Sequence, residues 1–178
     1  MTNNEDVIRQ IEATMQGQDL VPASVVRLWM SNSSLQTVGA VAQRVVRQSR
    51  RIQPPLSMDE ICTFIQNYYE RCLVENPQDG GYALNRHIAG LELAAWFTNL
   101  WRDPAVPRSY LMSLKAMLSR LIKEGKVPAH DLVSAVLEHI FETKEIAEFF
   151  DDWKDDPDLR GAFTLSMEWG TDHWQTPG

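Results

Sequence analysis

The spacing of apolar residues constrains the fold of this chain more than any other feature of its sequence. Apolar side chains recur about every 3.6 residues, as on one face of an α-helix. No run alternates cleanly between apolar and polar residues or carries a hairpin signal such as Asn-Gly. Because a half-buried strand needs that alternation, we expect an all-α protein, an irregular multi-helix bundle of about eight helices.

One segment is predicted to form the central helix of this bundle. Residues 82–101 are apolar on nearly every side. A helix that is hydrophobic all round belongs in the interior of a fold. We therefore expect the other helices to pack around this one.

The start of another helix is marked by a capping-box pattern. Ser57 and Glu60 have the S-x-x-E spacing and precede a run of apolar residues at helical spacing. Pro54 and Pro55 stand just before them and end the preceding helix. The sequence thus predicts a helix that begins directly after Ser57.

The aromatic residues suggest how the chain is divided. Fifteen of the sixteen follow Ser57, and only Trp29 precedes Pro54. Large aromatic side chains bury the most apolar area per residue. We therefore expect a helical core domain of residues 57–170, a helical N-terminal appendage of residues 1–53 and a polar tail of residues 171–178.

The cysteines and the N-terminus bear on the compartment. Cys62 and Cys72 are ten residues apart in one predicted helix, which separates them by about 15 Å along its axis and prevents their pairing. We expect reduced structural thiols. The first residues are acidic and polar, unlike a signal peptide, and no apolar run approaches the roughly 18 residues of a membrane span. The sequence predicts a cytoplasmic protein with no membrane partner.

The charge of the chain is concentrated at its C-terminal end. Lys and Arg number 17 against 24 Asp and Glu, which gives a net charge of −7. Residues 142–178 hold ten acidic residues and three basic ones, so this segment carries the whole excess. Acidic surfaces speed association with basic partners. We therefore expect this segment either to pair with arginines of the same chain, at residues 44–51, or to bind a basic protein.

Aromatic residues interleave with these acids and would anchor a partner where they are exposed. Phe149, Phe150 and Trp169 belong to this set. Trp174 lies beyond the last predicted helix, residues 157–169, and is the indole that we most expect to be exposed. The predicted partner-binding residues are Asp151, Asp152, Trp153, Asp155, Asp156 and Trp174.

A basic stripe suggests an alternative function. The helix predicted before Pro54 carries four arginines near its end, and on a regular helix these fall within an arc of about 120°. They are Arg44, Arg47, Arg50 and Arg51. Residues 22–51 have a loose helix-turn-helix outline, with Gln36 and Thr37 as the candidates for base contacts. The alternative is thus a nucleic-acid-associated regulator, although the acidic charge of the chain argues against nucleic acid. A homodimer through residues 1–53 is a further expectation.

The predicted central helix carries a polar seam. Asn85, Glu92 and Asn99 recur every seven residues, so they lie within about 40° of one another on the helix. The seam is either a solvent-facing strip or the wall of a polar pocket. His87 lies about 140° round from Glu92, and we expect it in the core or at its boundary.

Motifs of catalysis and metal binding are missing from the sequence. It contains no phosphate-binding loop, nucleophile elbow or H-E-x-x-H pattern, and its histidines lack ligand spacing. The acidic run 151–158 does not make a calcium loop. In a loop counted from Asp156, Arg160 and Met167 stand at the fifth and twelfth positions, where calcium ligands are needed. We therefore expect no enzyme, no cofactor and no metal. The sequence predicts a non-catalytic acidic helical protein that binds another protein, as an inhibitor, an immunity-type protein or an adaptor.

Overall fold

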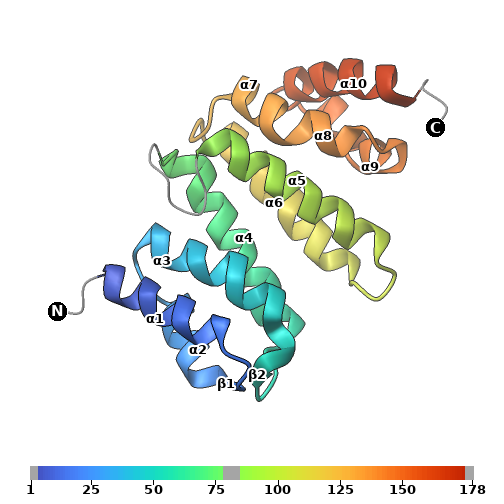
Figure 1. The fold of residues 1–178 in the computed structure, drawn as a ribbon. Helices are drawn as coiled ribbons and strands as arrows, with labels where there is room; N and C mark the ends of the chain where they lie inside the picture. The colour runs from blue at the N-terminus through green and yellow to red at the C-terminus, as the bar shows by residue number, and fades with distance from the viewer. Residues whose placement is uncertain (1–3, 78–84, 175–178) are drawn as a thin grey trace. The chain divides into compact units, whose positions relative to one another are not determined.

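The computed structural model confirms the all-α, multi-helix fold (Figure 1). It describes residues 4–77 and 85–174. Contacts divide the chain into two compact units, Met1–Asn85 and Arg86–Gly178. No helix in the described ranges has both the length and the apolar character needed to cross a membrane.

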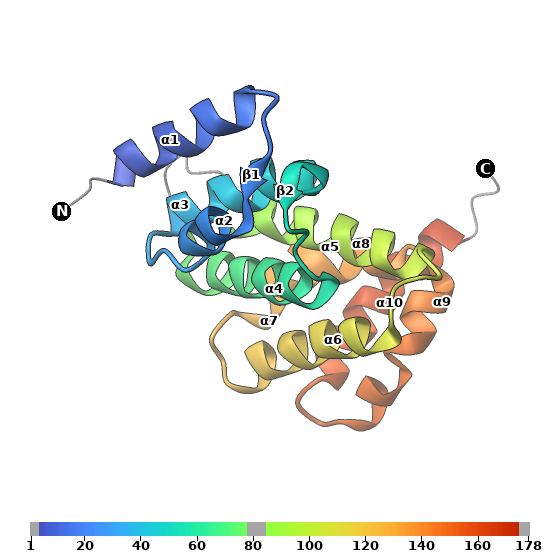
Figure 2. The ribbon, with the colours of Figure 1, turned by 90° about the horizontal axis from the view of Figure 1, so that it is seen from below.

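The first unit consists of helices of different lengths and one small strand pair. Its two strands pair in parallel over two residues each, with Val21 opposite Ile52 and both side chains buried (Figure 2). Two residues are too short to show alternation, so this pair could not be recognised from the sequence. The elements are α1 (Asn4–Gln16), β1 (Val21–Pro22), α2 (Ala23–Met30), α3 (Leu35–Ala40), the π-helical η1 (Val41–Val45), the 3₁₀ helix η2 (Val46–Arg51), β2 (Ile52–Gln53) and α4 (Met58–Glu75).

The capping box predicted at the start of α4 is confirmed. The Ser57 hydroxyl accepts a hydrogen bond from the Glu60 amide at 3.1 Å, and the Glu60 carboxylate accepts one from the Ser57 amide at 3.0 Å. Arg27 of α2 donates to the same carboxylate at 2.7 Å. These bonds, with that from Arg27 the strongest influence, lower the pKa of Glu60 to about 2. Glu60 therefore both caps α4 and ties it to α2.

The boundary between the units lies further along the chain than the aromatic residues suggested. The sequence grouped α4 with the residues that follow it, as part of a core of residues 57–170. In the structure α4 packs against α3 and η1, and the first unit ends at Asn85. The aromatic side chains of α4, such as Phe64 and Tyr68, are buried in these surroundings. The homodimer expected through residues 1–53 stays a prediction.

Both cysteines are free thiols buried in α4, as predicted. Burial raises the pKa of the Cys62 thiol, and the neighbouring charge of Asp59 raises it further. A raised pKa keeps the thiol protonated and unreactive. Cys62 and Cys72 therefore behave as small apolar side chains of the core.

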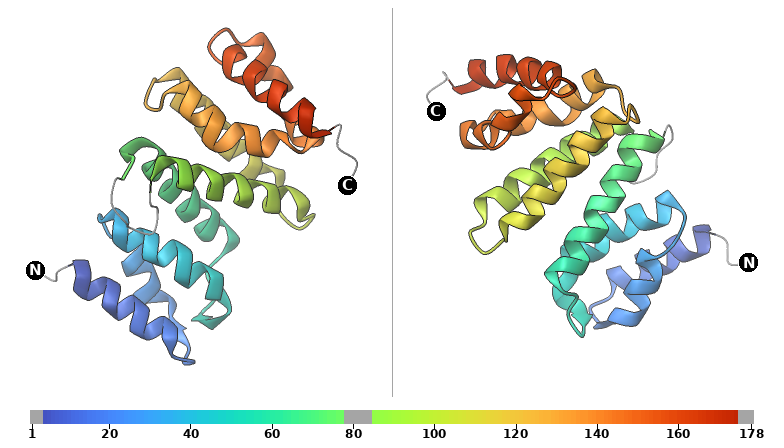
Figure 3. Two further views of the ribbon diagram at one scale, coloured as in Figure 1. Left: turned by 45° about the horizontal axis from the view of Figure 1, so that its top comes forward. Right: turned by 180° about the vertical axis from the view of Figure 1, so that it is seen from behind.

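The second unit is organised around one interrupted helix that spans residues 129–141. This helix includes a π-helical turn in its middle and lies between α5 and α10 (Figure 3). The elements of the unit are α5 (Arg86–Arg102), α6 (Arg108–Lys123), α7 (Ala129–Leu132), the π-helical η3 (Val133–Leu137), α8 (Glu138–Phe141), α9 (Lys144–Phe149), the 3₁₀ helix η4 (Asp151–Asp155) and α10 (Arg160–Trp174).

The helix 129–141 is more enclosed than α5, which the sequence placed at the centre. His87, Ala95 and Asn99 of α5 are exposed, so α5 is not buried all round. The exposed alanine explains the difference, because a small apolar residue raises the apolar count without needing burial. Helix 129–141 instead has fully or nearly fully buried side chains through most of its length: Leu132, Val133, Ala135, Val136, Leu137, Ile140 and Phe141.

Two glycines allow the neighbouring helices to approach this helix closely. A Cβ atom added at Gly90 of α5 would lie 2.5 Å from the Ala135 Cβ and 2.8 Å from its carbonyl oxygen. One added at Gly170 of α10 would lie 2.5 Å from the Phe141 carbonyl oxygen. Backbone atoms cannot yield as a flexible side chain does. Gly90 and Gly170 therefore set how closely α5 and α10 pack on helix 129–141.

The last helix is longer than expected. We predicted its end at residue 169 and a polar tail from residue 171, but α10 continues to Trp174. Residues 175–178 of the predicted tail lie outside the described residues.

We predict that Gly90→Ala lowers the free energy of unfolding by about 1–3 kcal/mol, because the new methyl group would clash with Ala135. Gly161→Ala in α10 is the matched control, since its Cβ would meet nothing within 4 Å. There the same change should be neutral or stabilising by up to about 1 kcal/mol. Urea denaturation of both variants checks this. Equal effects at the two positions would contradict close helix packing at Gly90.

A second prediction concerns acid stability. The pKa of Glu60 is lowered to about 2, so the stabilisation by its charged form is complete above the ordinary pKa of 4.5 and is lost as the pH falls towards 2. Glu60→Gln keeps a side chain that can cap α4 but removes the charge that binds Arg27. The urea midpoint of the variant should therefore lie below that of the wild type at pH 6 and converge with it as the pH approaches 2. A difference independent of pH would count against the Arg27–Glu60 interaction.

Candidate functional site

The acidic segment that the sequence singled out is bound to its own fold at two points. The first is Asp152 of η4, which accepts a hydrogen bond from Lys115 of α6. Lys115 also donates to the Phe149 carbonyl at 2.7 Å, and its ammonium lies 4.8 Å from the centre of the Phe149 ring. The Lys115 side chain is only 9% exposed, whereas that of Asp152 is 71% exposed. The lysine is thus the buried partner, and Asp152 reaches it from the surface.

The second point is Asp156, which accepts a hydrogen bond from Lys123 of α6 at 2.5 Å. This bond lowers the pKa of Asp156 and raises that of Lys123. Asp156 also accepts from the Asp158 amide at 3.0 Å, in the turn before α10. Asp152 and Asp156 together fasten the segment 151–156 to α6.

Asp151 and Asp155 remain at the surface. Asp151 pairs with Lys154 at 3.0 Å, and this hydrogen bond raises the pKa of Lys154. Asp155 is exposed and contributes a further negative charge near Lys154. An exposed pair of this kind contributes only about 0–1 kcal/mol to stability.

The two indoles predicted as anchors serve the core. Trp153 is 1% exposed and packs edge-on against Phe150, with 4.9 Å between ring centroids. Trp174 was expected in an exposed tail but lies in α10, half-buried, and its Nε1 donates to the Phe141 carbonyl at 2.9 Å. The pattern of acids around these indoles gave no sign of their burial, because a buried aromatic between exposed acids has the same local spacing.

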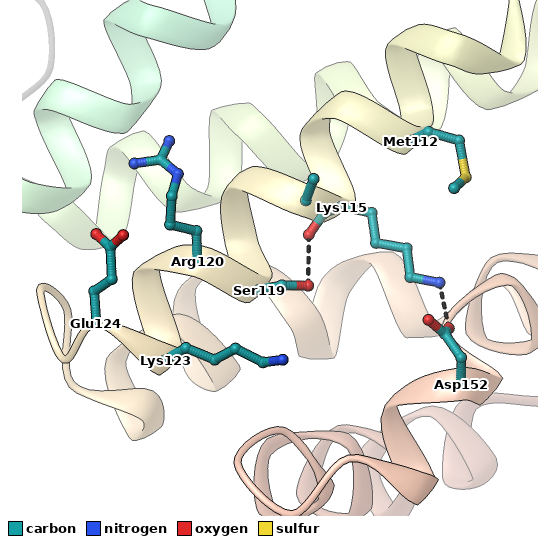
Figure 4. Close-up of a pocket in the computed structure, with 8 residues that line it drawn as sticks. Met112, Lys115, Ser119, Arg120, Lys123, Glu124 and Asp152 are labelled. Carbon is teal, nitrogen blue, oxygen red and sulfur yellow. Dashed lines mark hydrogen bonds and ion pairs between the residues drawn. The ribbon is translucent and has the colours of Figure 1, made fainter.

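A cavity of about 460 Å³ lies where α6 faces η4 (Figure 4). Lys115 extends across it from α6 to Asp152, while Arg120 and Glu124 point away from Asp152 (Figure 4). Lys115 is bound to Asp152 and Lys123 to Asp156, so two of the three positive charges that line the cavity are paired with aspartates of the same unit. The cavity is lined by Met112, Lys115, Ala116, Ser119, Arg120, Lys123, Glu124 and Asp152.

The predicted arginine stripe is not assembled as one exposed surface. The helix does not continue regularly, because η1 is π-helical, η2 is 3₁₀ and Gln48 is non-helical, with φ −110° and ψ 28°. Arg51 turns back to donate to the carbonyls of Thr14, Met15 and Asp19 at 2.8–3.1 Å. It therefore closes the C-terminal end of α1.

The other arginines of the stripe differ in their surroundings. Arg44 lies 3.3 Å from Glu12, and Arg50 is exposed. The side chain of Arg47 lies outside the described part of the structure. Of the two candidates for base contacts, Gln36 is exposed but Thr37 is fully buried. Thr37 is therefore not accessible to a base, whereas Gln36 and Arg50 are exposed.

The predicted polar seam lies only partly on α5, because Asn85 precedes the first residue of that helix. Asn85 and Asn99 are exposed, and Glu92 is half-buried. Asn99 also lines a small polar pocket, whereas Asn85 and Glu92 do not. His87 is exposed rather than part of the core. The two interpretations of the seam thus apply to different members of it.

A surface that the sequence analysis found only in part lies along α10. It is a groove of about 410 Å³ between α10 and helix 129–141. Leu165 and Trp169 lie in it and are 52% and 40% exposed. We call it the acidic groove; it is lined by His130, Val133, Glu138, Leu165, Glu168, Trp169 and Asp172.

The geometry of α10 explains why these side chains come together. Residues 165, 168, 169 and 172 have the spacing i, i+3, i+4, i+7, which places them on one helix face. The buried face of α10 is made by other residues, among them Phe163 and Gly170. Trp169 is one of the aromatic residues that the sequence predicts as anchors. The helical spacing of this face also indicates Leu165, Glu168 and Asp172 as its neighbours.

Comparisons with known proteins do not extend this picture. No protein-family model matches the sequence, and searches of curated proteins and of solved structures give no match. Within residues 4–77 and 85–174, no group of three His, Cys, Asp or Glu side chains is placed to hold a metal ion. The geometry of the chain therefore carries the functional inference.

The attachment of η4 to α6 yields a prediction about two partners of one ion pair. Lys115→Ala should lower the free energy of unfolding by about 2–4 kcal/mol, because it removes a buried donor from the Phe149 carbonyl and the contact with the Phe149 ring. Asp152→Asn should cost less than about 1 kcal/mol, because that side chain is mostly in water. Urea denaturation measures both. Equal costs would show that the ion pair, rather than the buried lysine, holds η4.

Proposed function

We propose that the chain is a non-catalytic protein that binds a basic protein partner through the acidic groove on α10. The observation that carries the proposal is the combination of exposed apolar side chains with carboxylates that have no partner in the same fold. The proposal is supported by the unpaired carboxylates of the groove, by its exposed apolar side chains and by the chemistry of a partner that would fit both.

The carboxylates of the acidic groove are not used by the fold. Glu138, Glu168 and Asp172 make no hydrogen bond or ion pair with any other side chain of the described chain. Asp152 and Asp156, in contrast, are bound to lysines of α6. The carboxylates of the acidic groove are therefore unpaired among the described residues, whereas those of the segment 151–156, apart from the exposed Asp155, are paired with lysines.

The apolar anchors of the groove are exposed but ordered. Leu165 and Trp169 lie side by side on α10, four residues apart. The Trp169 ring stacks on that of His173, with 4.7 Å between centroids, and this contact restricts the indole. Tryptophan is enriched among residues that dominate binding energy. A restricted side chain also loses less entropy when a partner covers it.

The partner that fits this groove is a basic segment with apolar side chains. An arginine could stack on Trp169 and at the same time pair with Glu168 or Asp172. An aliphatic side chain beside it would cover Leu165. The charges would mainly speed association and make it sensitive to salt. By class, this is the behaviour of an inhibitor, an immunity-type protein or an adaptor, which acts by covering or scaffolding its partner.

We predict that the tagged chain captures a basic protein from its native cell and that the captured protein binds the acidic groove. Trp169→Ala should weaken binding of the purified partner by roughly 30-fold or more, as expected for a central anchor. Glu168→Gln with Asp172→Asn should slow association and flatten its salt dependence. Surface plasmon resonance at two salt concentrations measures these quantities.

Two control variants separate the groove from general effects. Leu28→Ala removes an exposed apolar side chain from the first unit. Glu145→Gln with Glu148→Gln removes two exposed charges from α9. Both should leave binding nearly unchanged. A partner that tolerates the changes at Trp169, Glu168 and Asp172, or responds equally to the controls, would refute this function.

A further inference from the structure

Another pocket of the C-terminal unit lies on the side of helix 129–141 that faces α5, between α5 and the end of α8. Its volume is about 330 Å³. From α5 it receives Thr98, Asn99 and Arg102, together with a small apolar floor of Leu91, Ala94 and Ala95. From the end of α8 and the turn after it come His139, Glu142 and Thr143. We call it the α5–α8 pocket.

The pocket is rich in hydrogen-bond donors that the fold does not use. The side chains of Thr98, Asn99, Arg102 and Thr143 make no hydrogen bond or ion pair with the rest of the described chain. They provide a guanidinium, an amide and two hydroxyl groups. Four polar side chains from two separate elements thus face one small volume without partners in it.

The pocket holds one carboxylate, which lies beside an imidazole. Glu142 is the acidic residue of its lining, and its Oε1 lies 3.4 Å from His139 Nδ1. The His139 imidazole thus lies next to the Glu142 carboxylate. Arg102 forms no ion pair with a carboxylate of the described residues. Arginine selects planar carboxylates and phosphates, because its fork of N–H groups matches their oxygen atoms.

We propose that the α5–α8 pocket binds a small organic oxyanion, whose carboxylate or phosphate group is held by Arg102, Asn99 and the two threonine hydroxyls. The short carbon part of the ligand lies on Leu91, Ala94 and Ala95. The volume limits the ligand to a few carbon atoms besides the anionic group. This site is independent of the acidic groove, which takes a cation-bearing partner and shares no lining residue with it.

The test uses two probes, inorganic phosphate and butyrate, which separate a tetrahedral from a planar anionic group. Each is titrated into the full ¹⁵N-labelled chain at constant ionic strength, with sodium chloride as the balancing salt. Saturable shifts of the amide signals of Asn99, Arg102 and Thr143 are expected with at least one probe. Saturation by one probe alone assigns the anionic group.

Variants show whether the expected residues hold the ion. Arg102→Gln should weaken binding by about tenfold or more, because it removes the charge-assisted hydrogen bonds. Thr98→Val with Asn99→Leu keeps the charge but removes donors and should weaken binding several-fold. Arg9→Gln, the same substitution at an exposed arginine of the first unit, should bind as the wild type does. Unchanged signals elsewhere in the spectrum show that each variant is folded.

Three results would overturn the proposal. The first is the absence of saturation with both probes. The second is binding by Arg102→Gln that is as strong as binding by the wild type. The third is a set of shifts centred on residues outside the pocket.

Discussion

The close approach of helix backbones at Gly90 and Gly170 is the constraint on which the second unit depends. These glycines bring α5 and α10 against Ala135 and Phe141, on the same interrupted helix. Residues next to these glycines line the two binding surfaces: Leu91 lines the α5–α8 pocket and Trp169 the acidic groove. The acidic groove is bounded by α10, and the α5–α8 pocket by α5, so both grooves share helix 129–141 as one wall. The packing that stabilises the unit thus also shapes the two surfaces to which we assign binding.

The acidic excess of the C-terminal segment serves two purposes that the sequence does not separate. Asp152 and Asp156 neutralise lysines of α6 and hold the segment 151–156 in place. Glu168 and Asp172 have no such partner within the described residues. The difference arises from contacts between residues more than thirty positions apart, such as Lys115 and Asp152. Net charge alone therefore cannot tell a structural carboxylate from one that is available to another molecule.

The sequence predicted what depends on local spacing and missed what depends on distant contacts. The helices and the capping box of Ser57 and Glu60 follow from local patterns, and both are confirmed. The arginine stripe required a regular helix through residue 51, but the π-helical turn and the kink at Gln48 change the direction of the side chains. The burial of Trp153 depends on the packing of α10 against η4, which no local pattern encodes. The face of α10 that carries Leu165 and Trp169 could have been recognised from the sequence. Its residues repeat at helical spacing and lie on a different side of the helix from the buried residues.

Arg51 has a consequence for how the first unit assembles during synthesis. The carbonyls at and just after the C-terminal end of α1 are hydrogen-bonded by the guanidinium of Arg51, which is synthesised 32–37 residues later. When α1 leaves the ribosome, its final turn can be satisfied only by water, and the helix is too short to be stable alone. The ribosome must therefore release the chain beyond residue 51 before α1 can dock. Formation of the C-terminal end of α1 is therefore coupled to formation of the segment that holds Arg51.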